Sequence, residues 1–496
     1  MTEPAYERLS VQDSSFLIFE TATTPMHLGG TTIFDVGPLA SPSGGVDIDR
    51  IRRYIGSRLH WIPRYRQKLK YIPIENHPVW VDDDRLNLHY HVRHTSLPKP
   101  GNDKQLKDLS ARILSQQLDR GKPLWEVWIV EGLEGGRFAM IVKTHHCVVD
   151  GISGVGLMSV LLNPISDDTI EPAPEWRPRP APSGTDLMRD ALLHRASQGA
   201  QIGRALRDLV AKSQRRSRVA ENLATAWEMI TEGLKQPAPT PLNQAIGHYR
   251  RFDWKAVPIE QVKQIKNRLG GAINDVVLTT VAGAVGEFLA HRDALPKRLD
   301  YRAVVPVSVR SSEEQGTGGN RVSAWLLSLP IAQRDPLKRY EHVRRTTERL
   351  KKNNQAKGIE VLTQLGELST PILTLGVGLA SRMSPYNLIV TNVPGPQTSL
   401  YMLGAPMIEG YPHVPLFENQ GLAVALFSYN GRLCWGFNAD WDLVPDLDVF
   451  VAAVERSFKE LHAAATKETR RPAIAKRRRA NAARDTSVSG PAKARG

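Results

Sequence analysis

Two adjacent histidines in the segment KTHHCVVDGISG, residues 143–154, have the residue types and the spacing of a reactive turn. His145 and His146 are followed by Asp150 and Gly151. Because imidazole titrates near neutrality, a histidine can take a proton from an attacking alcohol and return it to a leaving group. A carboxylate is favoured at a helix start, and glycine permits backbone angles that a Cβ would block. The segment therefore predicts a catalytic turn made of these four residues.

Other roles for the same residues stay open. A histidine near a strand is often structural. Binding of one metal ion by both histidines is awkward, because adjacent residues on a strand point to opposite faces, and the sequence therefore predicts no metal site. Cys147 would need a lowered thiol pKa to act as a nucleophile, and its neighbours in the sequence offer no cause for one. General-base catalysis and a structural role remain the two leading interpretations.

The elements around the pair are those of an α/β protein. The segment RFAMIV, residues 137–142, predicts a buried strand, and GISGVGLMSVLL, residues 151–162, predicts a helix, so the pair lies in a turn at a strand end. Further strands are predicted at residues 31–36, 302–307, 388–391, 422–428 and 433–438, and further helices at residues 103–117, 259–268, 274–292, 335–353 and 447–465.

Two proline-rich breaks divide the chain of 496 residues. The first spans residues 163–184, and the second, KQPAPTPLN, ends at Asn243. We expect an N-terminal α/β half over residues 1–165 and a C-terminal α/β half over 241–465. A linker and a basic helical bridge over 166–240 join them, and a disordered basic tail follows over 466–496.

Charge and composition indicate where such a protein acts. The net charge is +14, and ten Lys or Arg against two acidic residues after residue 466 place +8 of it in the tail. A basic tail favours an anionic membrane surface or nucleic acid, but it has no interleaved aromatic residues, so no specific nucleic acid is predicted. Two cysteines and no signal peptide favour the cytoplasm. We expect no membrane span, so that any membrane contact is peripheral.

At this point the segment HHCVVDG resembles the HHxxxDG signature of the CoA-dependent acyltransferase superfamily, which includes chloramphenicol acetyltransferase and peptide-synthetase condensation domains. The rest of the chain is similar to one family within it, the bacterial wax ester synthase/diacylglycerol acyltransferase family. The matching blocks follow in family order over about residues 8–460: LSVQDSSFLIFETATTPMHLGG (9–30), GKPLWEVWIVEGL (121–133), TPLNQAIGHYRRF (240–252), GGAINDVVLTTVAGAV (270–285), VPVSVR (305–310), GGNRVSAWLLSLP (318–330) and NLIVTNVPGPQTSLYMLGAPM (387–407).

The resemblance implies a fold and a set of roles. The fold would be two chloramphenicol-acetyltransferase-like domains, mixed sheets flanked by helices, that form a pseudo-dimer around a central tunnel. His146 would be the general base, His145 supportive and Asp150 structural. Asn274 is a candidate aid to catalysis or an ordinary helix N-cap. Arg310 is a candidate partner of Asp150 or a solvated arginine at a strand end.

The resemblance also implies an activity. The enzyme would move an acyl group from acyl-CoA, a co-substrate, to diacylglycerol, with long-chain alcohols as a further acceptor that yields wax esters; no cofactor or metal is implied. It would be cytoplasmic, in peripheral contact with the inner face of the cell membrane and with lipid bodies. Two alternatives stay open: an acyltransferase that uses a carrier-protein donor or a glycolipid or polyketide alcohol, and a non-catalytic lipid-droplet coat protein.

Overall fold

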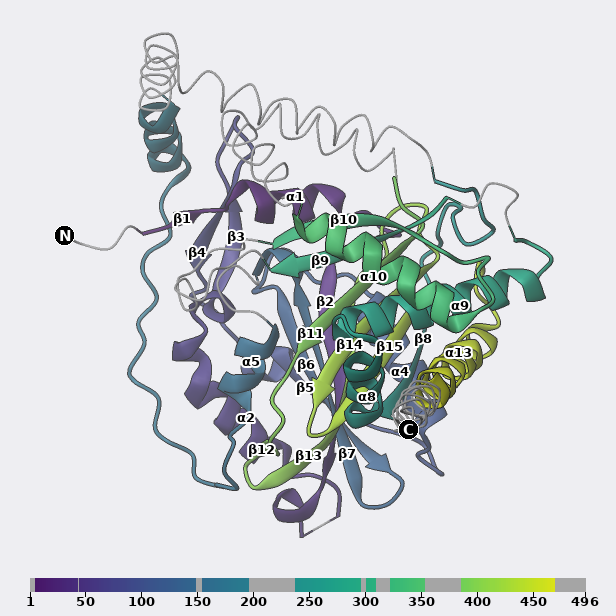
Figure 1. Cartoon of the computed structure of the whole chain (residues 1–496). Helices are drawn as coiled ribbons and strands as arrows, with labels where there is room; N and C mark the ends of the chain where they lie inside the picture. Colours follow the sequence, from purple (N-terminus) through teal and green to yellow (C-terminus); the bar gives the residue numbers. More distant parts are fainter. Residues whose placement is uncertain are drawn as a thin grey trace, which may run out of the picture.

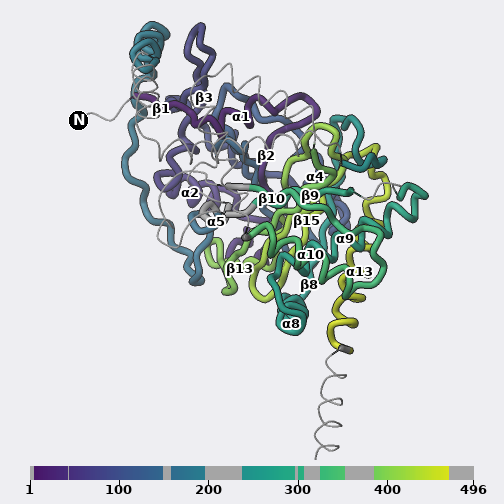
Figure 2. The backbone as a smooth tube through the Cα atoms, turned by 45° about the horizontal axis from the view of Figure 1, so that its top comes forward, coloured from purple at the N-terminus to yellow at the C-terminus, as the bar shows by residue number. Residues whose placement is uncertain are grey.

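The computed structural model describes residues 5–42, 44–148, 154–195, 237–295, 300–308, 322–352 and 385–468. The first half of the chain, purple to blue in Figures 1 and 2, lies beside the second half, green to yellow. Each half is built on a six-stranded sheet, and a smaller three-stranded sheet belongs to the first half. Parallel and antiparallel pairs occur in both large sheets, so the predicted class, mixed sheets flanked by helices, is confirmed.

The sheet that carries the histidine pair has the strand order β12-β13-β2-β7-β6-β5. Its strands are β12 (Tyr401–Met402), β13 (Ala405–His413), β2 (His27–Asp35), β7 (Arg137–His145), β6 (Trp125–Leu133) and β5 (Val92–Ser96). The first two strands come from the second half of the sequence, and β13 pairs antiparallel with β2 of the first half. The second half thus contributes a hairpin to the first sheet, which the predicted boundaries do not describe.

The sheet of the second half has the strand order β10-β9-β11-β14-β15-β8. Its strands are β10 (Val322–Leu329), β9 (Tyr301–Ser308), β11 (Leu388–Pro394), β14 (Leu422–Tyr429), β15 (Arg432–Asp440) and β8 (Arg250–Pro258). Every residue of β14 is buried, which explains its almost continuous apolar sequence LAVALFSY. A strand that is covered on both faces has no position for exposed polar side chains.

Helices lie beside the sheets of both halves (Figure 1). They are α1 (Val11–Phe19), α2 (Ile48–Arg58), α3 (Leu88–His91), α4 (Asp103–Ser115), α5 (Gly154–Leu161), α8 (Ile259–Leu269), α9 (Ile273–His291), α10 (Pro336–Lys352) and α13 (Leu447–Glu468), with short 3₁₀ turns η1 (Gly37–Leu39), η2 (Leu59–Trp61), η3 (Pro63–Arg66) and η4 (His146–Val148). Helix α4 shares an apolar cluster with both halves, in which Leu106 and Ile141 join Trp254.

Helix α9 is, within the described residues, the one helix long and apolar enough to cross a membrane, but 78% of its apolar window is buried inside the structure. Val277, Val281 and Phe288 belong to the core of the second half, together with Phe450 of α13. The apolar composition of α9 is therefore that of a helix surrounded by protein on most sides.

The smaller sheet and the proline-rich segment lie on the first half. The sheet has the order β1-β4-β3, from β1 (Glu7–Arg8), β4 (Pro78–Asp82) and β3 (Gln67–Tyr71). The predicted linker, residues 163–184, is held against it, because Arg179 pairs with Asp82 at 2.8 Å. Residues 186–195, the described start of the predicted basic bridge, are helical, and Leu187 packs against this sheet. Residues 196–236 of the bridge and residues 469–496 of the tail lie outside the described residues, and the first three residues of the predicted tail, 466–468, belong to α13.

Candidate active site

The end of β7 positions the histidine pair. His145 is the last residue of β7 and lies opposite His27 at the start of β2. The chain then turns into η4, and the backbone N–H of His146 donates to the carbonyl of Met26 at 2.8 Å. The predicted turn at a strand end is therefore present. Its two histidines differ in surroundings, because His145 is buried in the sheet and His146 is only partly buried.

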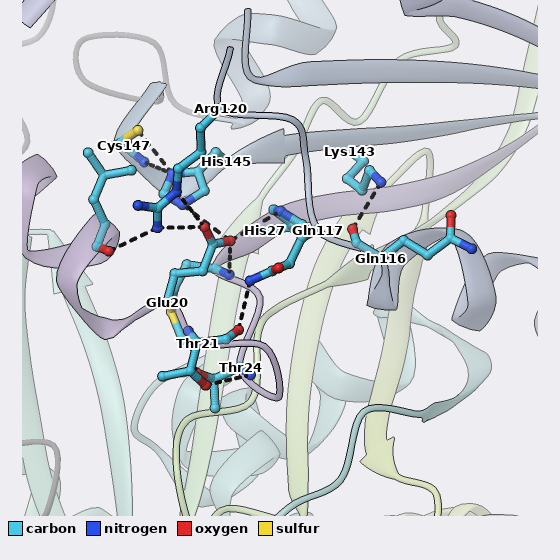
Figure 3. Close-up of polar contacts among 12 residues, drawn as sticks. Glu20, Thr21, Thr24, His27, Gln116, Gln117, Arg120, Lys143, His145 and Cys147 are labelled. Atoms are coloured by element: carbon cyan, nitrogen blue, oxygen red, sulfur yellow. Dashed lines mark hydrogen bonds and ion pairs between the residues drawn. The ribbon is translucent and has the colours of Figure 1, made fainter. Parts of the chain in front are cut away.

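Both ring nitrogens of His145 face a neighbouring group. Nδ1 lies 2.9 Å from Sγ of Cys147 and accepts the backbone N–H of Cys147 at 3.2 Å. Because the backbone N–H can only donate, Nδ1 must carry a lone pair, and in the neutral ring the proton is then on Nε2. That nitrogen lies 3.6 Å from Oε1 of Glu20. His145 is thus held in one tautomer between Cys147 and Glu20 (Figure 3).

His146 has no comparable set of partners. Its ring stacks on Phe16 of α1, with centroids 3.6 Å apart and planes 15° apart. Its Nδ1 is buried without a hydrogen-bond partner. Burial, more than the neighbouring His145, lowers the pKa of His146 to about 3. The imidazole is therefore neutral at physiological pH, and a neutral ring is the form that accepts a proton.

Glu20 lies at the centre of a buried cluster that supports the pair (Figure 3). Its carboxylate accepts from Arg120 at 2.7 Å and from the backbone N–H of Met26 at 3.2 Å, and it faces Nε2 of His27 at 3.5 Å. Burial alone would raise the pKa of Glu20, but the nearby His145 ring and the hydrogen bond from Arg120 outweigh it and lower the pKa to about 2. A fixed negative charge therefore lies beside His145.

A buried lysine lies on the same strand as His145. Lys143 donates to the carbonyls of Ile113 and Gln116 at 3.2 and 3.1 Å and pairs with Glu126 at 3.2 Å. Burial lowers the pKa of Lys143, and burial together with the charge of Lys143 lowers the pKa of His27 well below its ordinary value. His27 is accordingly a neutral member of the cluster.

Three predicted site residues lie outside the described residues. They are Asp150 and Gly151, which end the motif, and Arg310, which follows β9. The proposed contact between Asp150 and Arg310 therefore stays a prediction.

Asn274 lies near the start of α9, but the expectation that it forms an ordinary N-cap is wrong. The N-cap is Ala272, whose backbone N–H donates to the side chain of Asp275 at 2.7 Å, which puts Asn274 at the second helical position. Oδ1 of Asn274 accepts from Nδ2 of Asn392 on β11 at 2.7 Å. Among the described residues, no hydrogen bond joins Asn274 to either histidine, so its part in catalysis stays a prediction.

Four further residues of the site were missed by the motif. Phe16, Glu20 and His27 all lie in the block 9–30, and Arg120 directly precedes the block 121–133. A sequence signal existed for Glu20, since it is an acidic residue after an apolar helix and shortly before a strand. Nothing local pairs it with Arg120, which is 100 residues away in the chain.

No metal cluster is found within the described ranges. No group of three or more His, Cys, Asp or Glu side chains there could hold a metal ion. A depression of about 690 Å³ lies on α10 and is lined by Lys338, His342 and Arg349 among others, with none of the predicted site residues. The central tunnel implied by the resemblance stays a prediction.

The chemistry available at the turn follows from these contacts. Nδ1 of His145 is occupied by Cys147 and its Nε2 faces Glu20 at 3.6 Å, while His146 is neutral, partly exposed and without a side-chain hydrogen bond among the described residues. A base must be free to accept a proton. The burial of the Cys147 thiol raises its pKa well above the ordinary value, which is the opposite of what a nucleophilic cysteine needs. The arrangement therefore suits general-base catalysis by His146.

Comparison with known proteins agrees with this chemistry. The wax ester synthase/diacylglycerol acyltransferase catalytic domain matches residues 9–277, and the WS/DGAT C-terminal domain matches residues 318–462. Two proteins of Mycobacterium tuberculosis named probable diacylglycerol O-acyltransferases are similar: one is 32% identical over 91% of this chain and 98% of its own, the other 30% identical over 91% and 95%.

Solved structures give the same result. The wax ester synthase/diacylglycerol acyltransferase from Marinobacter aquaeolei VT8 superposes with a TM-score of 0.65 at 26% identity, over 92% of this chain and all of that one. A starter condensation domain of rhizomide synthetase shares the fold, with a TM-score of 0.57 at 11% identity over 93% and 95% of the two chains. The two-domain fold of the acyltransferase superfamily is thus confirmed, and the chain belongs to the wax ester synthase/diacylglycerol acyltransferase family.

Proposed function

We propose that this protein is an acyl-CoA:diacylglycerol O-acyltransferase that forms triacylglycerol and uses His146 as its general base. The chain belongs to a family of acyltransferases, and relatives that it matches over most of their length are named diacylglycerol O-acyltransferases. Long-chain alcohols are a second acceptor class, because the family includes wax ester synthases. The observation that carries the choice of base is the difference between the two Nδ1 atoms: that of His145 is occupied by Cys147, whereas that of His146 has no hydrogen-bond partner and its ring is partly exposed.

The reaction needs one proton transfer in each direction. The imidazole of His146 accepts the proton of the acceptor hydroxyl as its oxygen attacks the thioester carbonyl carbon of acyl-CoA. The tetrahedral intermediate then collapses, the carbon–sulfur bond breaks, and the sulfur of CoA takes the proton from His146. An ester and free CoA result, no covalent acyl-enzyme forms, and the residues of this chain need no cofactor for this step.

The environment of His146 favours the neutral base. The stacked Phe16 ring and the burial of Nδ1 exclude water from one side of the imidazole, and its pKa is lowered to about 3. A low pKa keeps the base unprotonated before the alcohol arrives. The Glu20 carboxylate faces Nε2 of His145, the residue before the base, and so holds the neighbour of the base in place.

We place the protein in the cytoplasm, in peripheral contact with the inner face of the cell membrane and with lipid bodies. The support is the water-insoluble acceptor and the basic tail, in which +8 of the net charge of +14 lies after residue 466.

The test is an assay of the purified full chain with palmitoyl-CoA, in which diacylglycerol and hexadecanol are offered in parallel and the esters are separated by chromatography. We expect triacylglycerol from the wild type and a loss of about 100-fold or more in kcat for His146→Ala, the usual effect of removing a general base. A folded His146→Ala variant with wild-type kcat would refute the assignment of the base.

Two further arms address the alternatives. Palmitoyl-carrier protein offered in place of palmitoyl-CoA tests the donor, and a preference for it would replace acyl-CoA in the proposal. A wild-type protein that binds lipid vesicles but esterifies neither alcohol would favour the coat-protein alternative.

A further inference from the structure

The turn between α1 and β2, residues 21–25, is a place where the two halves of the chain touch. On one side of it, the guanidinium of Arg250, the first residue of β8, donates to the carbonyl of Thr23. His248, just before β8, donates from Nδ1 to the carbonyl of Ala22 at 3.0 Å. The ring of Phe19 at the end of α1 also meets the ring of Phe417 edge to face at 5.7 Å.

The other side of the same turn holds the catalytic pair. Glu20 precedes the turn and faces Nε2 of His145 at 3.6 Å. Met26 follows the turn, and its carbonyl accepts the backbone N–H of His146 at 2.8 Å. The turn, five residues long, therefore links the second half of the chain directly to the two histidines.

The turn is not held by its own hydrogen bonds alone. The hydroxyls of Thr21 and Thr24 lie 2.7 Å apart, and the backbone N–H of each donates to the carbonyl of the other, at 3.4 and 3.2 Å. These bonds fix the shape of the turn but not its direction relative to the second half. Direction requires a contact from outside, and the carbonyls of Ala22 and Thr23 receive it from β8 and the residues before it.

The side chain of Arg250 is buried and held in place by several acceptors. Its side chain is 2% exposed and lies 3.5 Å from the equally buried carboxylate of Asp440. It also donates to the carbonyls of Gly247 and Tyr249 at 2.7 and 2.9 Å. Burial lowers the pKa of Arg250 to about 10, so the side chain is charged at neutral pH. A planar guanidinium held by several acceptors has one orientation, and it points its remaining donors at Thr23.

We propose that Arg250 is a positioning residue for acyl transfer: through Thr23 it orients the 21–25 turn, so that Met26 and Glu20 hold His146 and His145 in their reactive geometry. The inference rests on the proposed function. By this proposal, the second half of the chain helps to position the general base, which lies in the first half. Displacement of a catalytic group by about 1 Å is enough to lower kcat by as much as 100-fold.

The test compares Arg250→Lys and Arg250→Gln with the neighbouring control Arg251→Gln in the full chain. Arg251 donates to the carbonyl of Trp441 and stacks on its ring, so its contacts stay inside the second half. We expect Arg250→Gln to lower kcat about 10-fold or more with KM for palmitoyl-CoA within about twofold, because the base is misplaced and the donor site is not. Arg250→Lys should restore part of the loss, and Arg251→Gln should match the wild type.

Hydrogen exchange supplies the readout that a general loss of stability would not give. Amides of residues 20–27 should exchange faster in Arg250→Gln, while those of β14 stay as slow as in the wild type. A folded Arg250→Gln with unchanged kcat overturns the proposal. So does a fall in kcat without faster exchange in residues 20–27, and so does an equal fall in Arg251→Gln.

A milder variant covers the case in which both Arg250 variants fail to fold. His248→Ala removes the exposed contact with Ala22 and leaves Arg250 and Asp440 in place. It should lower kcat in the same direction by about 2-fold to 5-fold with faster exchange in residues 20–27, and wild-type values for both would overturn the proposal. If the wild type itself forms no ester, the proposed function fails, while the exchange experiment still decides whether Arg250 orients the turn.

Discussion

The Glu20 carboxylate lies 3.6 Å from Nε2 of His145 and 2.7 Å from the guanidinium of Arg120. The carboxylate therefore connects the supporting histidine of the motif to a positive charge in a segment far away in the sequence. This arrangement makes Glu20 a structural support of the pair, and it predicts how the protein responds when the charge is removed.

Replacement of Glu20 by Gln should lower both stability and activity. The amide keeps the shape of the side chain, but it leaves Arg120 without its counter-charge and His145 without an acceptor that is fixed in place. We expect the free energy of unfolding to fall by about 2 kcal/mol, as for a buried hydrogen bond to a charged group, and kcat to fall about 10-fold. Urea denaturation and the palmitoyl-CoA assay measure the two effects.

The control for this change is Glu7→Gln. Glu7 pairs with Arg64, but its side chain is 61% exposed, so the pair contributes little in water. Unfolding and activity should both stay at wild-type values. Equal losses in the two variants would show that the position of Glu20 beside His145 is not what matters.

The pH dependence of activity should lack the limb that an ordinary histidine base produces. The pKa of His146 is lowered from 6.5 to about 3, so the ring is neutral, and active as a base, at every pH well above 3. We therefore expect kcat/KM with palmitoyl-CoA to stay level from pH 8 down to about pH 5. An acidic limb centred near pH 6.5 would show that the ring titrates as it does in water.

The same shift makes a prediction about stability. Because the folded-state pKa of His146 lies below the unfolded value, the unfolded chain binds the proton first as the pH falls below about 6.5. The contribution of this group to stability is complete above pH 6.5 and is lost as the pH falls toward 3. His146→Gln has no such titration, so its free energy of unfolding should depend less steeply on pH than that of the wild type over this window.

Local sequence patterns predicted the elements well where burial is one-sided or complete. The helix predicted at 274–292 is α9 (Ile273–His291), and the strand predicted at 422–428 is β14 (Leu422–Tyr429). Both are apolar segments with charged or turn residues at their ends, so their boundaries can be predicted from the local sequence. The turn that carries the histidine pair was predictable for the same reason, because His145 ends an apolar strand.

Partners that are distant in the sequence could not be predicted in this way. The strand β13 has the same alternation whichever sheet it joins, and only the fold places Tyr411 opposite Thr31. The contacts of Glu20 with Arg120 and of Arg250 with Thr23 join segments 100 and 227 residues apart. Such contacts make these side chains part of the site, and the hydrophobic periodicity of the local sequence does not predict them.

A substitution of Asn274 can distinguish a catalytic role of its side chain from a packing role. Its Oδ1 is occupied by Asn392 at 2.7 Å, so its amide N–H groups are the part that could donate to an oxyanion. Asn274→Asp keeps the acceptor for Asn392 and places a carboxylate in the first turn of α9, where it is favoured. We expect thermal stability to be unchanged and kcat to fall about 100-fold, because a donor has been replaced by a negative charge.

Asn392→Ala is the matched control for Asn274. It breaks the same hydrogen bond but leaves the amide of Asn274 in place, so we expect a loss of about 1 kcal/mol in stability and a much smaller change in kcat. If Asn274→Asp has wild-type kcat, the amide takes no part in stabilising the oxyanion, and its bond to Asn392 is its whole function.

The two thiols should be unreactive in the native protein, and the thiol of Cys147 should act only as a hydrogen-bond donor to His145. Cys147 and Cys434 are fully buried, and burial raises the pKa of both, that of Cys434 to about 11. A thiol reagent at pH 8 should therefore label neither until urea unfolds the chain, when both react.

Cys147→Ser keeps a donor for Nδ1 of His145, whereas Cys147→Ala removes it. We expect kcat close to wild type for the serine variant and about 3-fold to 10-fold lower for alanine, since the tautomer of His145 is then held by the backbone N–H alone. Rapid labelling of native Cys147, or equal activity in the two variants, would contradict this account of how His145 is held.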